Sequence, residues 1–341
     1  MNRSRKNVGK RNKGTEFVNS FWESEPFVDR GLERVHERTA EIIKGSRGFI
    51  RPYLEEMLTQ QGKMLRPACL LLAFHAGEHG GGNEDHAVDL AAGIEMIHTA
   101  SLVHDDIIDG SSVRRGESTL HSRIGNRKAV VAGDYLLARA FSLLTGLSDE
   151  NISAEKVSDR ISRLCESEID QDSEAGDFSI SVQHYLRRIG GKTASLFSLA
   201  CYLGAQAGKL SPMQVRRLSK FGYNLGMSFQ IQDDVLDYLG SRTDMGKETG
   251  KDLREGIATL PIICACSKDS SGKLAAMLSG YPDLDVKAII NRTKELGGLS
   301  DAQAYARRYL RLAEGELKGL PNTEAKMILQ RLAQRLSSRR R

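Results

Sequence analysis

Two acidic clusters with the same DDxxD spacing interrupt apolar stretches of the sequence. They occur in VHDDIIDG, residues 103–110, and in FQIQDDVLDY, residues 229–238. Carboxylates are costly to bury close together unless cations neutralise them. One such cluster could be a solvated helix end. Two of them in apolar surroundings favour a site that binds cations.

The spacing within each cluster indicates which carboxylates point the same way on a helix. Asp105 and Asp109 are four residues apart and share one face, and so do Asp233 and Asp237. His98 lies two turns before the first pair, on the same face. Mg²⁺ prefers oxygen ligands and is commonly held by one or two carboxylates together with substrate phosphates. We therefore predict that the two clusters face each other across a cavity and hold a diphosphate through Mg²⁺.

Basic residues in four short motifs could bind the phosphate groups. The motifs are QGKMLRP, SSVRRG after the first cluster, GGKTASLF, and the glycine-rich loop after the second cluster. Each basic residue alone could be an ordinary surface charge, but together they supply donors for more than one diphosphate. The candidate phosphate ligands are Lys63, Arg66, Arg114, Arg115, Lys192 and Lys247.

Helices must position these residues, because helical periodicity dominates from about residue 28 and the alternation typical of strands is nearly absent. We predict helices over residues 29–60, 66–78, 86–108, 117–146, 153–173, 179–208, 211–240, 254–269, 284–296, 300–319 and 322–338. The chain of 341 residues has no repeat of fixed period and no linker between two cores. The sequence therefore predicts one all-α domain over residues 26–341, a single large helical bundle around a central cavity.

The basic residues in excess are concentrated at the two ends of the chain. The first thirteen residues carry six basic and no acidic side chains, the last three are all Arg, and the rest has more acidic than basic residues. We expect residues 1–25 to form a basic, disordered arm, with loose attraction to an anionic membrane surface as the alternative. No basic stripe is interleaved with aromatic residues, so no nucleic-acid partner is expected. No secretory signal or membrane-spanning run is recognised, which favours a cytoplasmic location.

Six segments of the sequence resemble the trans-type polyprenyl diphosphate synthases, also called isoprenyl diphosphate synthases. They are GKMLRP, EMIHTASLVHDDIIDGSSVRRG, GDYLLARAF, YLRRIGGKTASLF, FQIQDDVLDYLG and GKETGKDLREGIATLP. The segments follow the family's order and spacing, and the resemblance runs from about Phe27 to the C-terminus. It implies a helical, usually homodimeric prenyltransferase that joins isopentenyl diphosphate to an allylic prenyl diphosphate. It also implies three Mg²⁺ ions per active site.

The resemblance further implies a role for each matching residue. The expected metal ligands are Asp105, Asp109, Asp233 and Asp237. The expected catalytic residues are Asp105, Asp106, Asp109, Lys192, Thr193, Gln230 and Asp233. The expected ligands of isopentenyl diphosphate are Lys63, Arg66, His98 and Arg115. The residues expected beside the allylic diphosphate and the reacting carbons are Arg114, Lys192, Thr193, Gln230 and Lys247.

Two small residues one turn before the first cluster, Ala100 and Ser101, are expected to form the floor of the product tunnel nearest the metal. Short-chain members of the family often place an aromatic residue there, which blocks growth. The resemblance therefore implies a product of C30–C50, a quinone side-chain precursor, in preference to the C20 product of a geranylgeranyl diphosphate synthase. Leu137 and Phe141 are candidate stops deeper in the tunnel.

Other functions of the same fold can be weighed from the sequence. A terpene cyclase would need no isopentenyl site, and the intact basic set argues against it. A non-catalytic partner subunit would usually have lost its aspartates. A catalytic subunit that requires a partner remains open. The sequence departs from the family pattern at Ile257, where a Lys is common and contacts a diphosphate, and at Ser167, where a Gly is common.

Overall fold

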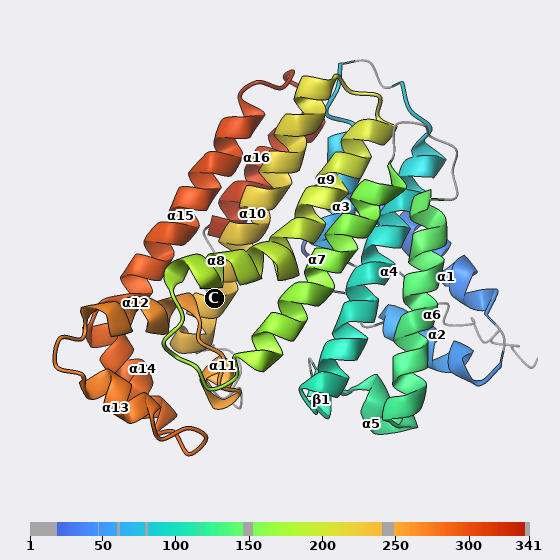
Figure 1. Ribbon diagram of the computed structural model, residues 1–341. Coiled ribbons are helices and arrows are strands. Elements are labelled where there is room, and N and C mark those ends of the chain that lie inside the picture. Colours follow the sequence, from blue (N-terminus) through green and yellow to red (C-terminus); the bar gives the residue numbers. More distant parts are fainter. Residues whose placement is uncertain are drawn as a thin grey trace, which may run out of the picture.

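The computed structural model describes residues 19–46, 48–59, 62–78, 81–114, 116–145, 153–240 and 249–337. In this part of the chain long helices stand side by side in a bundle, which confirms the predicted all-α class (Figure 1). The elements of the first half are α1 (Pro26–Lys44), η1 (Gly48–Ile50), α2 (Arg51–Thr59), α3 (Leu65–Phe74), α4 (Glu84–Ile108), β1 (Val113–Arg114), β2 (Glu117–Ser118), α5 (Leu120–Ile124), α6 (Asn126–Thr145) and α7 (Ala154–Ser173).

The second half of the chain runs from α8 to α16. Its elements are α8 (Val182–Ile189), the π-helical turn η2 (Gly190–Ala194), α9 (Ser195–Ala207), α10 (Pro212–Leu239), α11 (Lys251–Arg254), α12 (Leu260–Lys268), α13 (Lys273–Leu278), α14 (Val286–Glu295), α15 (Gly298–Leu317) and α16 (Glu324–Ser337). None of the described helices is both long and apolar enough to cross a membrane.

The helices that carry the acidic clusters lie within the bundle. Helix α4 packs against α3, α6 and α9, and α10 packs against α9 and α15. Helix α10 begins where the sequence indicates, since Ser211 and Gln214 form a reciprocal capping box in front of Pro212. The capping box therefore fixes the N-terminus of this long helix.

Glycines allow α3, α9 and α10 to approach one another unusually closely. A Cβ atom at Gly204 of α9 would lie 2.0 Å from the carbonyl oxygen of Leu70 in α3. A Cβ atom at Gly222 of α10 would lie 2.4 Å from the carbonyl oxygen of Phe197 in α9. Any side chain at these two positions would push the backbones apart. We call these two contacts the glycine seam.

Several predicted elements are divided in the structure. The helix expected over residues 29–60 is broken between Lys44 and Gly48, where Gly48 adopts a positive φ. The helix expected over 117–146 is interrupted at Gly125, which also has a positive φ and separates α5 from α6. The segment that follows the helix expected over 86–108 carries the short antiparallel pair β1–β2, which extends into the first residues of the helix expected over 117–146. Helix α13 was not predicted from the sequence.

Part of the segment expected to be a disordered arm is packed onto the bundle. Trp22 is only 1% exposed, and the Glu25 carboxylate accepts two hydrogen bonds, of 2.6 and 2.7 Å, from Arg331 of α16. The prediction was therefore wrong for residues 19–25. Residues 1–18 and the three final arginines lie outside the described residues.

Candidate active site

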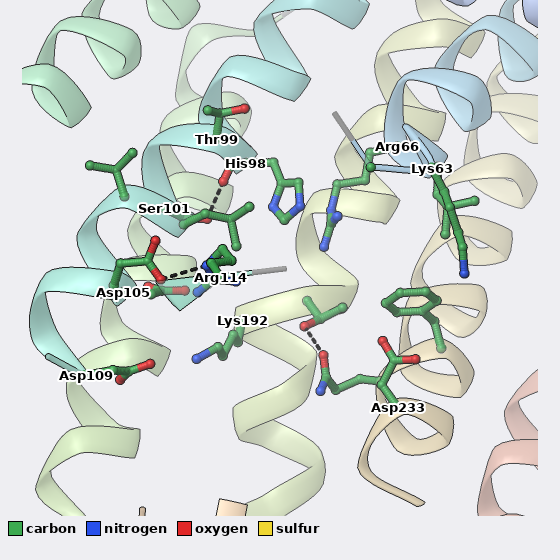
Figure 2. Close-up of a pocket in the computed structure, with 18 of the residues that line it drawn as sticks. Lys63, Arg66, His98, Thr99, Ser101, Asp105, Asp109, Arg114, Lys192 and Asp233 are labelled. Carbon is green, nitrogen blue, oxygen red and sulfur yellow. Dashed lines mark hydrogen bonds and ion pairs between the residues drawn. The ribbon is translucent and has the colours of Figure 1, made fainter. Parts of the chain in front are cut away.

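A cavity of about 1320 Å³ opens between α4, α7, α8 and α10. The acidic clusters line it from opposite sides: Figure 2 shows Asp105 and Asp109 on α4, Asp233 on α10, and Lys192 between them. The predicted arrangement of two facing clusters is therefore present in the structure. Arg115 and Lys247, which the sequence also suggested for this site, lie outside the described residues.

The first cluster lies at the C-terminal end of α4. Asp109 caps the helix, and burial together with the nearby Glu168 carboxylate raises the pKa of Asp105 to about 7. Asp106 is buried and accepts a hydrogen bond of 2.7 Å from the Arg114 guanidinium. This ion pair neutralises one carboxylate of the cluster, whereas Asp105 remains in an environment that disfavours its negative charge.

The π-helical turn η2 presents the Lys and Thr of the GGKTASLF motif to the cavity. Lys192 forms a 2.6 Å ion pair with Glu168, and Thr193 is buried in the same wall. A Cβ atom at Gly191 would lie 1.7 Å from the Ser167 hydroxyl, so the turn can pass α7 only with glycine at this position. π-Helical turns often occur at functional sites. Because Gly191 has no side chain, the Ser167 side chain has room beside the turn.

A chain of hydrogen bonds orients the amide of Gln230 in the opposite wall. The Thr193 hydroxyl donates to Oε1 of Gln230 at 2.7 Å, and Nε2 of Gln230 donates to Asp234 at 2.8 Å. The hydroxyl of Tyr185 donates to the other oxygen of Asp234 at 2.6 Å. Burial raises the pKa of Asp234 to about 6, while these two hydrogen bonds oppose the shift. The amide oxygen of Gln230 is therefore held beside the Thr193 hydroxyl.

Asp237, in the last turn of α10, contacts the backbone at the start of α11. Its carboxylate accepts hydrogen bonds from the backbone N–H groups of Lys251 and Asp252, at 3.1 and 3.2 Å. Its side chain is absent from the wall of the cavity, which Asp233 and Asp234 line instead. Asp237 therefore fixes the start of α11, and its role as a metal ligand stays a prediction.

The basic residues predicted for a second substrate gather at the other end of the cavity. Lys63, Arg66 and His98 all line it, and Figure 2 shows them above the acidic residues. The guanidinium of Arg66 lies 4.7 Å from the centre of the Phe197 ring. Burial lowers the pKa of Arg66, while the Glu95 carboxylate acts in the opposite direction. One cavity therefore joins an acidic end to a basic end.

The donor set fits a metal ion that is shared with a substrate. Among the described residues, no three His, Cys, Asp or Glu side chains are close enough to hold a metal ion by themselves. Mg²⁺ characteristically takes one or two carboxylates and completes its shell with phosphate and water oxygens. The raised pKa of Asp105 shows a carboxylate that a bound cation would stabilise. Asp105, Asp109 and Asp233 are the carboxylates best placed to hold such a cation.

The four residues expected to limit the length of the product tunnel differ in burial and in their contact with the cavity. Ser101 lines the cavity, whereas Ala100 is fully buried and does not contribute to the wall. Phe141 is 41% exposed on α6, so it cannot close a tunnel within this chain. Leu137 is partly buried against the core. A small apolar cavity of about 20 Å³ shares wall residues with the large one, namely Met57, Glu95 and Thr99.

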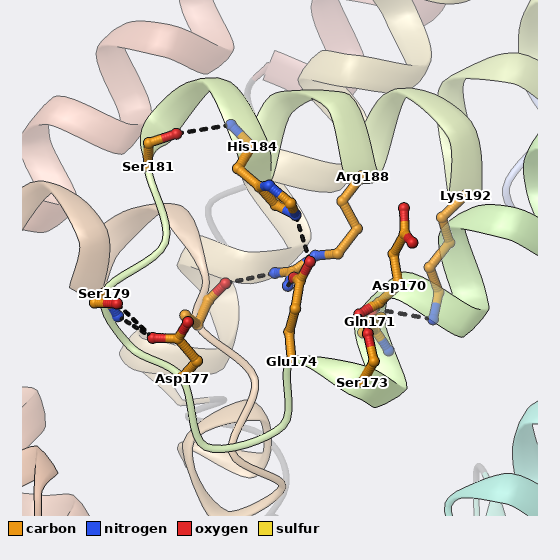
Figure 3. Close-up of polar contacts among 11 residues, drawn as sticks. Asp170, Gln171, Ser173, Glu174, Asp177, Ser179, Ser181, His184, Arg188 and Lys192 are labelled. Atoms are coloured by element: carbon orange, nitrogen blue, oxygen red, sulfur yellow. Dashed lines mark hydrogen bonds and ion pairs between the residues drawn. The ribbon is translucent and has the colours of Figure 1, made fainter.

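Sequence reasoning missed several polar residues in the cavity wall. Arg188 is 4% exposed and is held by the Glu174 carboxylate at 3.0 Å and by the carbonyl oxygen of Ala258 (Figure 3). Glu174 also contacts His184 (Figure 3). The YLRRIGGKT stretch could have drawn attention to Arg188, because a basic residue on the buried side of an amphipathic helix needs a polar partner.

The comparisons with known proteins agree over most of the chain. The polyprenyl synthetase family model matches residues 48–293. Heptaprenyl diphosphate synthase component 2 of Geobacillus stearothermophilus is 36% identical over 310 residues, covering 90% of this chain and 95% of that protein. A crystal structure of polyprenyl synthase from Caulobacter crescentus CB15, complexed with calcium and isoprenyl diphosphate, has a TM-score of 0.85 and 31% identity. That match covers 96% of this chain and 100% of the other.

A crystal structure of geranylgeranyl pyrophosphate synthase from Lactobacillus brevis ATCC 367 has the same TM-score of 0.85, with 27% identity. It covers 94% of this chain and 100% of the other. The match to the polyprenyl synthetase family model and to relatives named diphosphate synthases identifies the protein as a prenyltransferase. The chain belongs to the polyprenyl synthetase family.

Proposed function

We propose that the protein condenses isopentenyl diphosphate with an allylic prenyl diphosphate, with Mg²⁺, to make an all-trans polyprenyl diphosphate of C30–C50, a quinone side-chain precursor. The observation that supports this proposal is the single cavity that carries both acidic clusters and a separate basic end. A terpene cyclase would have no use for the basic end. The two substrates would therefore bind side by side with their reacting carbons between the two ends.

The acidic end would receive the allylic diphosphate. When bound, Mg²⁺ would supply positive charge that stabilises the departing diphosphate. Arg114 and Lys192 line the same end and can donate charge-assisted hydrogen bonds to phosphate oxygens. The same chemistry requires that water be kept away from the allylic cation, which explains why carboxylates stand in an apolar helix.

Carbon–carbon bond formation would take place between the two ends. The bond from C1 of the allylic unit to its diphosphate oxygen breaks, and the double bond of isopentenyl diphosphate attacks C1. The adduct then loses a proton to the departing diphosphate. The hydroxyl of Thr193 and the amide oxygen of Gln230 are fixed in this region by their mutual hydrogen bond. Their dipoles can stabilise the cation without forming a bond to it.

The preference for a long product rests on the α4 wall. Ser101 is small and lines the cavity, so the first turn behind the acidic cluster leaves room for a chain. The relative named for a heptaprenyl product supports this reading. The similar solved structure named for a geranylgeranyl product keeps a C20 product as the alternative.

An apolar surface supports a homodimer. Val130 and Phe141 lie on one face of α6, since they are eleven residues apart, and both are about 40% exposed; Val131 is 59% exposed beside them. An exposed patch of this kind commonly marks a protein interface. The relative named component 2 keeps a heteromeric assembly as the alternative.

The proposal is tested by incubating the purified protein with MgCl₂, labelled isopentenyl diphosphate and farnesyl diphosphate. We expect a ladder of products that ends between C30 and C50. Asp105→Ala and Asp233→Ala should each lower kcat by orders of magnitude, because the departing diphosphate loses a counter-charge. Asp283→Ala is the control and should keep the activity, since it removes an exposed carboxylate that is outside the cavity wall. Near-normal turnover in both alanine variants would exclude the proposal.

A further inference from the structure

A second cavity, of about 270 Å³, lies between α7 and α9, outside the candidate active site. These two helices pack against each other in the bundle (Figure 1). The wall of this outer cavity consists of four charged residues of α7 and two residues of α9, namely Lys156, Asp159, Arg160, Arg163, Leu199 and Tyr202. None of the six lines the larger cavity, so the condensation proposed above makes no use of them.

Three of the charged residues are cations on one face of α7. Lys156, Arg160 and Arg163 follow one another at intervals of four and three residues, which brings their side chains to the same side of a helix. The ammonium of Lys156 lies 5.3 Å from the centre of the Tyr202 ring, so it is held toward α9. Asp159 is the single carboxylate among the residues of this wall. Positive charge therefore exceeds negative charge in the outer cavity.

The two arginines lack the counter-charges that other cations of the bundle have. In the part of the chain that the structure describes, neither Arg160 nor Arg163 forms an ion pair with a carboxylate. Arg188, by contrast, is paired with Glu174 at 3.0 Å. Arg160 is partly buried, and this burial together with the charge of Arg163 lowers its pKa. An anion in the cavity would remove the repulsion between the two guanidinium groups.

The backbone beneath these arginines supports the π-helical turn of the active site. The carbonyl oxygen of Arg163 accepts a 2.7 Å hydrogen bond from the Ser167 hydroxyl. A Cβ atom at Gly191 of η2 would lie 2.9 Å from the same carbonyl oxygen. A ligand held by the Arg163 side chain would therefore bind to the turn of α7 on which η2 packs.

We propose that the outer cavity binds a phosphate group through Arg160, Arg163 and Lys156, at a site separate from the catalytic cavity. Three cations and one carboxylate match a phosphate, which carries between one and two negative charges at neutral pH. Each planar guanidinium can donate two parallel hydrogen bonds to phosphate oxygens, and the lysine adds a point charge. A free phosphate ion and the head group of phosphatidic acid share this chemistry.

Isothermal titration calorimetry with sodium phosphate, in metal-free buffer of constant ionic strength, tests the site. Arg160→Gln/Arg163→Gln should raise Kd by about 10- to 100-fold, the loss expected when charge-assisted contacts are removed. Arg307→Gln/Arg311→Gln removes two exposed arginines of α15 and changes the net charge equally, so it should bind phosphate like the wild type. Lys63→Gln/Arg66→Gln alters the catalytic cavity alone and should also keep this binding.

Thermal unfolding without phosphate checks the fold of the variants. Arg160→Gln/Arg163→Gln should unfold at or above the wild-type Tm, because it removes a repulsion between like charges. If its Tm is lower, Arg163→Gln alone, which changes an exposed side chain, has to show a rise in Kd.

Sedimentation with phosphatidylcholine vesicles, with and without phosphatidic acid, separates the two sources of the phosphate. Binding to phosphatidic acid that is lost in Arg160→Gln/Arg163→Gln but kept in Arg307→Gln/Arg311→Gln would identify a lipid head group. Weakened phosphate binding without any effect on vesicles would identify the free ion. The proposal is overturned if these two double variants behave alike in both measurements, or if phosphate binding is lost in Lys63→Gln/Arg66→Gln instead.

Discussion

At the scale of single residues, the charge of the Asp105 carboxyl depends on what else occupies the cavity. Burial and the Glu168 carboxylate raise its pKa from 3.8 to about 7. Between these two values the folded protein without metal holds a proton that the unfolded chain has released. This contribution to stability is complete below about pH 4 and is lost as the pH rises toward 7, because the folded state then has to ionise a buried group.

Magnesium must compete with that proton, which gives the first prediction. Added MgCl₂ should raise Tm more at pH 8 than at pH 6, because the carboxylate is already ionised at the higher pH. Differential scanning fluorimetry at the two pH values measures the difference. Asp105→Asn should remove most of it. Equal shifts at both pH values in the wild-type protein would show that Asp105 does not bind the metal.

Ile257 gives a second prediction at this scale. It lines the cavity, and the resemblance described above implies that Lys is common at this position in the family. Ile257→Lys should lower KM for the allylic diphosphate by about 10-fold, since it adds one charge-assisted hydrogen bond. Ile257→Met has similar length without charge and serves as the control. If the two variants behave alike, the side chain at this position does not reach the diphosphate.

At the scale of elements, α4 carries both the first acidic cluster and the wall along which the product would grow. Ser101→Phe should shorten the final product to C15–C20 while the first condensation keeps its rate, because the ring fills the cavity one turn behind the reacting carbons. Chromatography of the labelled products gives their lengths. Ser101→Ala should leave the length unchanged. Products of wild-type length from the Phe variant would mean that the chain leaves the cavity by another route.

The helical class and the pairing of the acidic clusters could be predicted from the sequence, because both depend on spacing along one element. Asp105 and Asp233 are brought to facing walls by helices whose apolar faces are plain in the sequence. Spacing gave no indication of the contacts of Asp237, whose partners are backbone N–H groups fourteen and fifteen residues further along the chain. Arg188 could not be predicted, since its place in the cavity depends on how distant helices pack.

At the scale of the whole molecule, the apolar face of α6 predicts an assembly of two chains. Val131→Asp should convert a dimer into monomers, because it places a charge within the patch formed with Val130 and Phe141. Size-exclusion chromatography with light scattering measures the mass. Met213→Asp changes an equally exposed residue at the start of α10 and should leave the dimer intact. A wild-type monomer that becomes active only with a second protein would instead support a heteromeric enzyme.

Because of the glycine seam, the two sides of the cavity differ in how well they tolerate amino-acid substitutions. Helices α3, α9 and α10 meet with backbone against backbone at Gly204 and Gly222, so the wall that carries Thr193 and Gln230 has no slack to take up a larger residue. The α4 wall is built from side chains of many sizes and can be altered one residue at a time. Descendants of such a fold can therefore diverge in product length by substitutions on one side while the chemistry on the other is inherited unchanged.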